Sequence, residues 1–426
     1  MARTKVVRLK RWSARNLTVG VMCGLFLLTA SGAGARPDRG ERDSSCTTLR
    51  IMARLYMAYG DYSKAQPLSE RALTLAGRNQ VSDSELCSCL IDLAYLYENQ
   101  GKLDKAEKMC QQGLELQQKV YYENHPYVAY TLRILSSIYQ KQGRYREARP
   151  VLEGAMAIMG KSHLADDPLV APFQVDFAEL LVAEGDFGEA AVYYQRALSS
   201  INKTYGPDHL YTAQVLGRIA RLYALGGGYL EAQSLIQRTL VVQEKVYGPD
   251  HHLLAPTWLT MAEIFEGQQE YEQAQRMLEK AWGTVQKKLG DKHPLAGRIL
   301  SLLGRAYIAG GKYAEADGVC QRAAKVLESA VGADNDRTAM AFNNLARLYI
   351  YQGKYDEAEK LCRRALRTLE NIFGQNHPNV AEVLETMSQL YRKAGNQKEV
   401  AKLGPRVQEI RDHEQVTYSS IVKAIE

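Results

Sequence analysis

Apolar residues recur along this chain with the spacing of a helix face and also with a much longer second period. Around Gly353 they lie three, four and seven residues apart on both sides of a turn, as expected for two amphipathic helices that run back against each other. The unit repeats every 42 residues, with one step of 41. The turn residues are Gly60, Gly101, Gly143, Gly185, Gly227, Gln269, Gly311, Gly353 and Gly395.

The same residue types flank each turn. The residue seven positions before the turn is always small, and the residue four positions before it is aromatic in every unit except the fourth, which has Leu181. A fixed period of this size predicts a repeat array. We expect first helices near 46–59, 84–100, 127–142, 169–184, 211–225, 254–268, 295–310, 337–352 and 379–394. We expect second helices to start near 62, 103, 145, 187, 229, 271, 313, 355 and 397.

Two units depart from the pattern. In the fourth, Pro172 falls inside the predicted first helix and Gln174 takes a core position, so we expect a kink or loosened packing. In the ninth, Gln397 and Val400 replace the aromatic residue and the alanine, and Pro405 is expected to interrupt the second helix. Terminal repeats need a polar outer face, so the ninth unit is interpreted as a cap.

The first residues are typical of a secretory signal peptide. Residues 1–16 carry six Lys or Arg and no acid, an apolar run covers 17–30, and Ala33-Gly34-Ala35 offers a small-x-small cleavage site. An uncleaved signal anchor is the alternative. We predict export, to a periplasm or a secretory space. The predicted parts are a signal peptide (1–35), a disordered linker (36–45), the repeat array (46–415) and a C-terminal tail (416–426).

Cleavage would remove the charge imbalance. The chain carries 54 Lys and Arg against 48 Asp and Glu, a net charge of +6, and the signal peptide accounts for all six excess basic residues. A formally neutral mature chain shows no electrostatic footprint of nucleic-acid binding. No segment beyond the signal is expected to span a membrane, so we predict no nucleic-acid partner and no membrane span after cleavage.

The repeat motif resembles the tetratricopeptide repeat. Its clearest copy runs from Asn343 to Tyr349, then from Gln352 to Ala358, and is followed by the loop residues His377-Pro378. The 42-residue period and this loop are similar to the kinesin-light-chain type of the family. The resemblance implies an all-α, right-handed superhelical solenoid of about nine helix-turn-helix pairs. It also implies that the first helices line a concave groove that holds a protein or peptide segment.

The candidate groove residues lie between the core positions of the first helices. Arginine forks suit carboxylates, so an acidic segment is a reasonable ligand, with Arg305 and Arg347 central. The alternative is a solvated face on which Glu179 and Glu263 balance the arginines. Only Asn343 matches the asparagines that the resemblance leads us to expect. The predicted groove residues are Arg221, Arg298, Arg305, Asn343, Arg347, Arg133, Tyr130 and Tyr95.

Histidines and cysteines offer little chemistry. The histidines that lie 24 residues after a turn are spread one per repeat, so we interpret them as loop or helix-start residues and predict no metal site. They are His125, His209, His251, His293 and His377. In an exported chain, Cys46, Cys87, Cys89 and Cys110 could supply one disulfide, whose pairing stays open.

The sequence contains no nucleophile elbow, phosphate loop, zinc-protease motif or paired carboxylates. We therefore predict a non-catalytic scaffold or adaptor without a cofactor, which binds a protein segment in its concave groove. One alternative is a structural or assembly component that associates with itself or with an envelope complex. Another is a non-catalytic subunit of a larger enzyme or secretion complex. The partner and the oligomeric state stay open.

Overall fold

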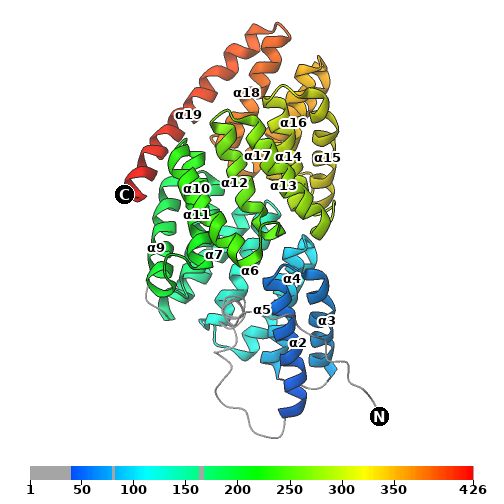
Figure 1. Ribbon diagram of the computed structural model, residues 1–426, viewed down its shortest axis with the longest axis vertical. Coiled ribbons are helices and arrows are strands. Elements are labelled where there is room, and N and C mark those ends of the chain that lie inside the picture. Colours follow the sequence, from blue (N-terminus) through cyan, green and yellow to red (C-terminus); the bar gives the residue numbers. More distant parts are fainter. Residues whose placement is uncertain (1–39, 79–81, 163–166, 426) are drawn as a thin grey trace.

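The computed structural model describes residues 40–78, 82–162 and 167–425, and the predicted signal peptide (1–35) lies outside them. The described chain forms nine antiparallel helix pairs (Figure 1). The first helices are α2 (Gly40–Ala58), α4 (Asp83–Asn99), α6 (Pro126–Lys141), α8 (Ala171–Glu184), α10 (Leu210–Leu225), α12 (Ala255–Gly267), α14 (Pro294–Ala309), α16 (Asp336–Tyr351) and α18 (Pro378–Lys393). The second helices are α3 (Tyr62–Arg78), α5 (Leu103–Val120), α7 (Tyr145–Ser162), α9 (Phe187–Tyr205), α11 (Tyr229–Tyr247), α13 (Tyr271–Leu289), α15 (Tyr313–Val331), α17 (Tyr355–Phe373) and α19 (Gln397–Ile425).

The turn glycine ends each first helix in a Schellman motif. At Gly101 (φ +71°) the N–H donates to the Glu98 carbonyl over 3.1 Å, and the Lys102 N–H reaches back to the Tyr97 carbonyl over 2.9 Å. This left-handed backbone favours glycine because a Cβ is strained there. Among the described residues, Gln269 (φ +63°) is the only non-glycine with positive φ, and it occupies the turn of the sixth pair.

The second recurring glycine ends the second helix in a different conformation from the left-handed cap that we expected. Gly206 has φ +86° but ψ 169°, so its backbone is positive in φ and extended in ψ. Its N–H donates to the Asn202 carbonyl, and the chain then leaves the helix axis sharply. Glycine is required because that region of conformational space excludes side chains.

Three sequence predictions are corrected. Residues 40–45, expected in a disordered linker, form the start of α2, because the helix of the first pair extends beyond its repeat boundary. α8 begins at Ala171, so Pro172 lies in its first turn, where no backbone donor is lost and no kink results. α19 runs through Pro405 and includes the predicted tail up to Ile425.

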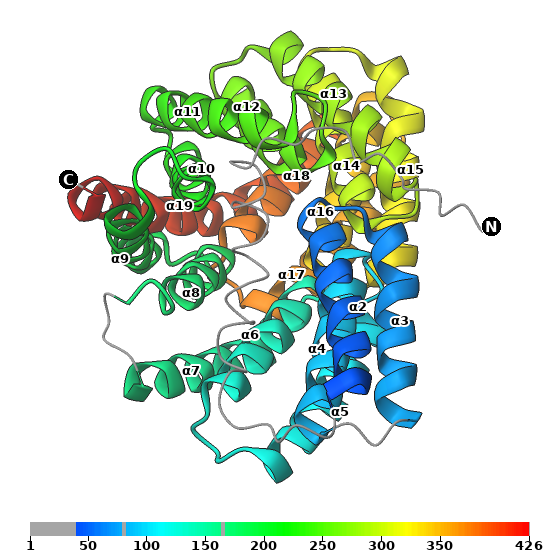
Figure 2. The ribbon, with the colours of Figure 1, turned by 60° about the horizontal axis from the view of Figure 1, so that its bottom comes forward.

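Small residues before each turn let paired helices pack closely. Ala178, Ala220 and Ala346 are fully buried at this position. At Gly304 an added Cβ would lie only 2.4 Å from the Cys320 sulfur on the facing helix α15. In Figure 2 the first helices α6, α8 and α10 lie on the inner side of the curve, and α7, α9 and α11 lie outside them. The inner helices therefore line the concave face.

The array winds tightly enough that its second superhelical turn contacts its first. The carbonyl two residues before the turn glycine accepts a hydrogen bond from a loop residue 194 residues later in three successive repeats. That separation corresponds to about 4.6 repeats of 42 residues. The donor–acceptor pairs are His293 Nε2 and the Asn99 carbonyl (3.1 Å), Asn335 Nδ2 and the Lys141 carbonyl (3.1 Å), and His377 Nε2 and the Ala183 carbonyl (2.8 Å). In both views α19 runs beside α9, and the two helices pack together.

The loop residues that join the turns also cap helices. His377 accepts the Asn379 N–H at Nδ1 over 3.1 Å, so its other nitrogen carries the proton that reaches the Ala183 carbonyl. Asn335 makes the same two contacts with its amide, accepting the Arg337 N–H at Oδ1 over 3.0 Å. His125, His209, His251 and His293 cap helices in the same way. The interpretation of these histidines as helix-start residues is confirmed.

Candidate functional site: the concave face

Ion pairs between neighbouring first helices line the concave face. Each pair joins the first helix of one repeat to that of the next, so the charges form a ladder along the inner side of the superhelix. The rungs are Arg133–Asp176 (2.9 Å), Arg218–Glu179, Arg221–Glu263 (3.5 Å), Arg305–Glu266 (2.5 Å) and Arg347–Glu382 (3.0 Å). Every arginine of the predicted groove therefore has a carboxylate of this chain beside it.

The structure gathers the predicted groove residues into three groups. Tyr95, Tyr130 and Arg133 lie in the second and third repeats, where both tyrosines act electrostatically on the Arg133 guanidinium. Arg221 and Arg298 share the carboxylate of Glu263, at 3.5 and 3.6 Å. The third group joins Arg305, Arg347 and the helix that carries Asn343.

A hollow of about 310 Å³ lies at the third group. It contains both Arg305 and Arg347, and its apolar wall includes Tyr351, which is 45% exposed. Tyr351 stacks on Tyr313 with ring centroids 4.4 Å apart. The lining residues are Arg305, Ile308, Ala309, Arg347, Tyr351, Glu385, Thr386 and Gln389. A segment that carries both an apolar side chain and a polar or charged group fits this lining.

Asn343 does not open into the hollow. Its side chain is fully buried, and neither its amide nitrogen nor its amide oxygen has a hydrogen-bond partner. The neighbouring Asn344 instead donates to the Ser301 hydroxyl and carbonyl on α14 over 3.0 and 3.2 Å. A ligand would reach Asn343 only if the first helices moved apart.

The electrostatic balance differs along the ladder. At Arg305 burial opposes the charge, but Glu266 and Glu382 outweigh it and raise the pKa. At Arg298 burial and the charge of Arg221 prevail over Glu263 and lower the pKa to about 10. Positive charge is therefore in excess near Arg221 and Arg298, whereas the arginines of the hollow are compensated.

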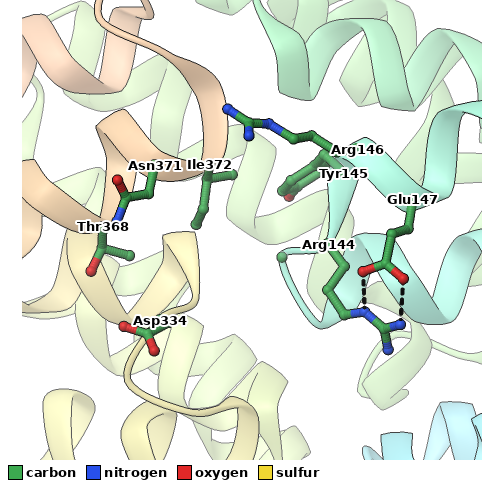
Figure 3. A pocket seen from close by; sticks show the side chains of 9 residues that line it. Arg144, Tyr145, Arg146, Glu147, Asp334, Thr368, Asn371 and Ile372 are labelled. Carbon is green, nitrogen blue, oxygen red and sulfur yellow. Dashed lines mark hydrogen bonds and ion pairs between the residues drawn. The ribbon is translucent and has the colours of Figure 1, made fainter.

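A second hollow, of about 360 Å³, lies where the two superhelical turns meet. Figure 3 shows its two walls, one from the start of α7 and one from α17 and the loop before α16. Arg144 faces Glu147 on the first wall, and Asn371 and Ile372 lie on the second. At this seam Tyr145 donates to Asp336 over 3.3 Å. The hollow thus belongs to the contact between turns.

Sequence reasoning missed several residues of the concave face. Asp176, Glu266 and Glu382 compensate the arginines, but they lie 35 to 43 residues from their partners and at different positions in the repeat unit. Tyr351 and Glu385 line the hollow from the neighbouring repeats. A search for opposite charges one repeat apart would have found most of these partners. No helix among the described residues is long and apolar enough to cross a membrane.

The comparisons with known proteins agree with the fold. The family described as tetratricopeptide repeat matches residues 85–161, 169–238, 220–282, 295–368 and 337–412, which is more than half of the chain. The chain belongs to the tetratricopeptide repeat family. This fold mediates protein–protein interactions in general. A comparison of the sequence with curated proteins gives no significant match.

Solved structures share the fold at low sequence identity. A Rap protein complexed with Competence and Sporulation Factor aligns with TM-score 0.56 and 16% identity, over 78% of this chain and 99% of that one. A putative kinesin light chain from Podosopora anserina aligns with TM-score 0.37 and 22% identity, over 49% of this chain and 98% of that one. A tetratricopeptide repeat protein from Parabacteroides merdae aligns with TM-score 0.40 and 18% identity, over 71% and 98%.

Proposed function

We propose that this protein is a non-catalytic scaffold that binds a protein or peptide segment in its concave groove, at the hollow around Arg305 and Arg347. The observation that carries the proposal is the lining of that hollow. Two guanidinium groups and an exposed tyrosine ring line one recess of about 310 Å³ on the inner helices. The complex of the Rap protein with its factor supports the proposal, because that protein has the same fold.

The ligand that fits best combines an apolar side chain with a carboxylate. Ile308, Ala309 and the ring of Tyr351 form the apolar wall. Arg305 and Arg347 each hold a carboxylate of this chain, but a guanidinium carries five N–H donors and one ion pair does not use them all. A ligand carboxylate would join these pairs, so we expect an acidic segment with an aromatic or aliphatic anchor.

Affinity capture with the full chain tests the proposal. The variant Arg305→Glu/Arg347→Glu is compared with the control Arg322→Glu/Arg364→Glu, which makes the same charge change on the second helices of the same repeats. Arg322 and Arg364 are half-exposed and pair with Asp291 and Glu328 at 2.6 and 2.5 Å. Captured proteins are identified by mass spectrometry. The milder variant Arg305→Gln/Arg347→Gln keeps the test valid if like charges unfold the reversed variant.

We expect a partner that the wild type and the control retain and that both groove variants lose. With the purified partner, affinity should fall at least about tenfold, because a hydrogen bond to a charged group contributes about 1.5–3 kcal/mol. Equal capture by all variants would contradict the proposal. It would place the interface on the convex face or the ends and favour a structural or assembly role.

The predicted export is a separate proposal, which the basic and apolar order of residues 1–35 supports. Its test is the N-terminal sequence of the protein recovered from outside the cytoplasm, which should start at Arg36. Recovery of the intact chain from Met1 would contradict cleavage and favour the signal anchor.

A further inference from the structure

Two cysteine sulfurs meet between the first two repeats. Sγ of Cys46 on α2 lies 3.6 Å from Sγ of Cys89 on α4, and the two residues are 0% and 1% exposed. They share a small cluster with Ala72 and Ala76 of α3. Cys46 also donates to the Ala72 carbonyl over 3.5 Å. All six cysteines in the described part of the chain are free thiols.

The other cysteines of these repeats point elsewhere. Cys87 precedes Cys89 by two residues on α4, so its side chain leaves the helix on a different side, and its sulfur faces the Gly113 carbonyl at 4.0 Å. Cys110 belongs to the large core cluster of the following repeats, whereas Cys46 and Cys89 belong to the terminal cluster. The geometry therefore selects one pairing among four cysteines whose sequence left the pairing open.

We propose that Cys46 and Cys89 are a disulfide site that joins the first helix of repeat one to the first helix of repeat two. A disulfide has an S–S length of about 2.05 Å, so the sulfurs must approach by roughly 1.5 Å, which side-chain rotation and a small helix shift can supply. The proposal is independent of the proposed ligand groove. It requires an oxidising compartment, which the predicted export would provide.

The oxidant is a small-molecule disulfide or a disulfide-exchange protein. The thiolate of one cysteine attacks a sulfur of the oxidant, forms a mixed disulfide and releases one thiolate of the oxidant. The second cysteine, after losing its proton, attacks the sulfur of the first and releases the other thiolate. The chain loses two electrons and two protons, and the oxidant is reduced to two thiols. The guanidinium of Arg50 lies close enough to favour the thiolate of Cys46.

The bond would act where a repeat array is weakest. A terminal repeat has a neighbour on one side only, so its helices open more readily than internal ones. Arg50 and Arg54 already pair with Asp92 at 2.8 and 2.7 Å across the same two helices. The disulfide adds a covalent link to this junction. Because both sulfurs are buried, oxidation should be rapid during folding and slow in the folded protein.

Peptide mapping tests the assignment. The full chain, with Cys23→Ser in every sample, is refolded with oxidised and reduced glutathione, alkylated without reductant and digested with trypsin. Trypsin releases Cys46 in residues 43–50 and Cys87 together with Cys89 in residues 79–102. The matched variants are Cys87→Ser and Cys89→Ser, which remove neighbouring buried thiols from the same helix.

We expect the two peptides to be linked in the wild type and in Cys87→Ser, and both to be alkylated in Cys89→Ser. Reductant should lower the melting temperature of the first two samples by roughly 5 °C and leave Cys89→Ser unchanged. Complete alkylation of the refolded wild type, or a link that needs Cys87 or Cys110, would overturn the proposal. Mapping of the wild type and Cys87→Ser decides the question even if Cys89→Ser fails to fold.

Discussion

The helix-pair turns of the first repeats and of the later repeats share one motif but have different surroundings. In repeats one to four a Cβ added to the turn glycine would approach a loop of the next superhelical turn, at Gly101 to 2.4 Å from Pro294 Cδ. At Gly227, Gly311, Gly353 and Gly395 it would meet no described heavy atom within 4 Å. All these glycines need positive φ. The comparison shows that one local rule carries a second constraint only where the superhelix covers the turn.

The sharpest way to break this comparison is an alanine at both kinds of turn. Gly101→Ala places a methyl group against Pro294 and a side chain in the left-handed region, and should lower the free energy of unfolding by about 3 kcal/mol. Gly353→Ala brings only the backbone strain, about 1 kcal/mol. Urea unfolding followed by circular dichroism measures both. Equal losses would mean that the two superhelical turns do not touch in solution.

The next largest effect separates the two functions of the loop histidines. His377 caps α18, stacks on Phe373 and reaches the Ala183 carbonyl, whereas His209 caps α10 and stacks on Tyr205, with no such bond to another turn among the described contacts. His377→Ala should therefore cost about 2 kcal/mol and His209→Ala about 1 kcal/mol. Urea midpoints at pH 7.5 give the difference. A larger loss at His209 would contradict the bond between turns.

The same histidine predicts a pH dependence. Burial lowers the pKa of His377 from 6.5 to about 4, so the unfolded chain binds the proton first as the pH falls. Its contribution is complete above pH 6.5, declines towards pH 4 and is constant below. His377→Asn copies the residue that repeat eight already uses, Asn335, which makes both contacts without titrating. Between pH 7.5 and 5 this variant should lose about 2 kcal/mol less stability than the wild type. An unchanged pH dependence would contradict the assignment.

The smallest effect sharpens the comparison from the other side. Gln269 holds the turn of the sixth repeat at φ +63°, which costs a non-glycine residue about 1 kcal/mol. Gln269→Gly should therefore raise the free energy of unfolding by somewhat less than that amount, because glycine also gains freedom in the unfolded chain. Thermal and urea unfolding measure the change. A loss of stability would show that the Gln269 side chain makes a contact that outweighs the strain.

The local fold followed from the sequence, but the winding of the repeats did not. The period located all nine second helices at their first residue, because glycine at the turn and apolar spacing are local properties. The contact of His377 with Ala183 depends on small angles between repeats that add up over 194 residues, and no single repeat encodes it. The pattern of His-Pro loops indicated helix caps, but the role of the second ring nitrogen depends on what lies across the seam.

The groove shows the same limit. Arg305 and Arg347 were predicted together and lie in one hollow, since residues one period apart on neighbouring first helices become neighbours in space. The carboxylates beside them, Glu266 and Glu382, occupy other positions of the unit, so a search confined to one position overlooks them. The burial of Asn343 was equally hidden, because it is decided by how closely adjacent first helices approach.

The separation of 194 residues between joined positions also restricts how this gene can change in length. An open array tolerates the gain or loss of a whole unit, because each unit meets only its neighbours. Here a unit inserted between Asn99 and His293 would carry the loop one repeat too far around the axis and leave both groups facing the wrong partner. Units added beyond α19 would leave the existing register untouched. The number of repeats between joined turns is therefore fixed by geometry, and growth is confined to the ends.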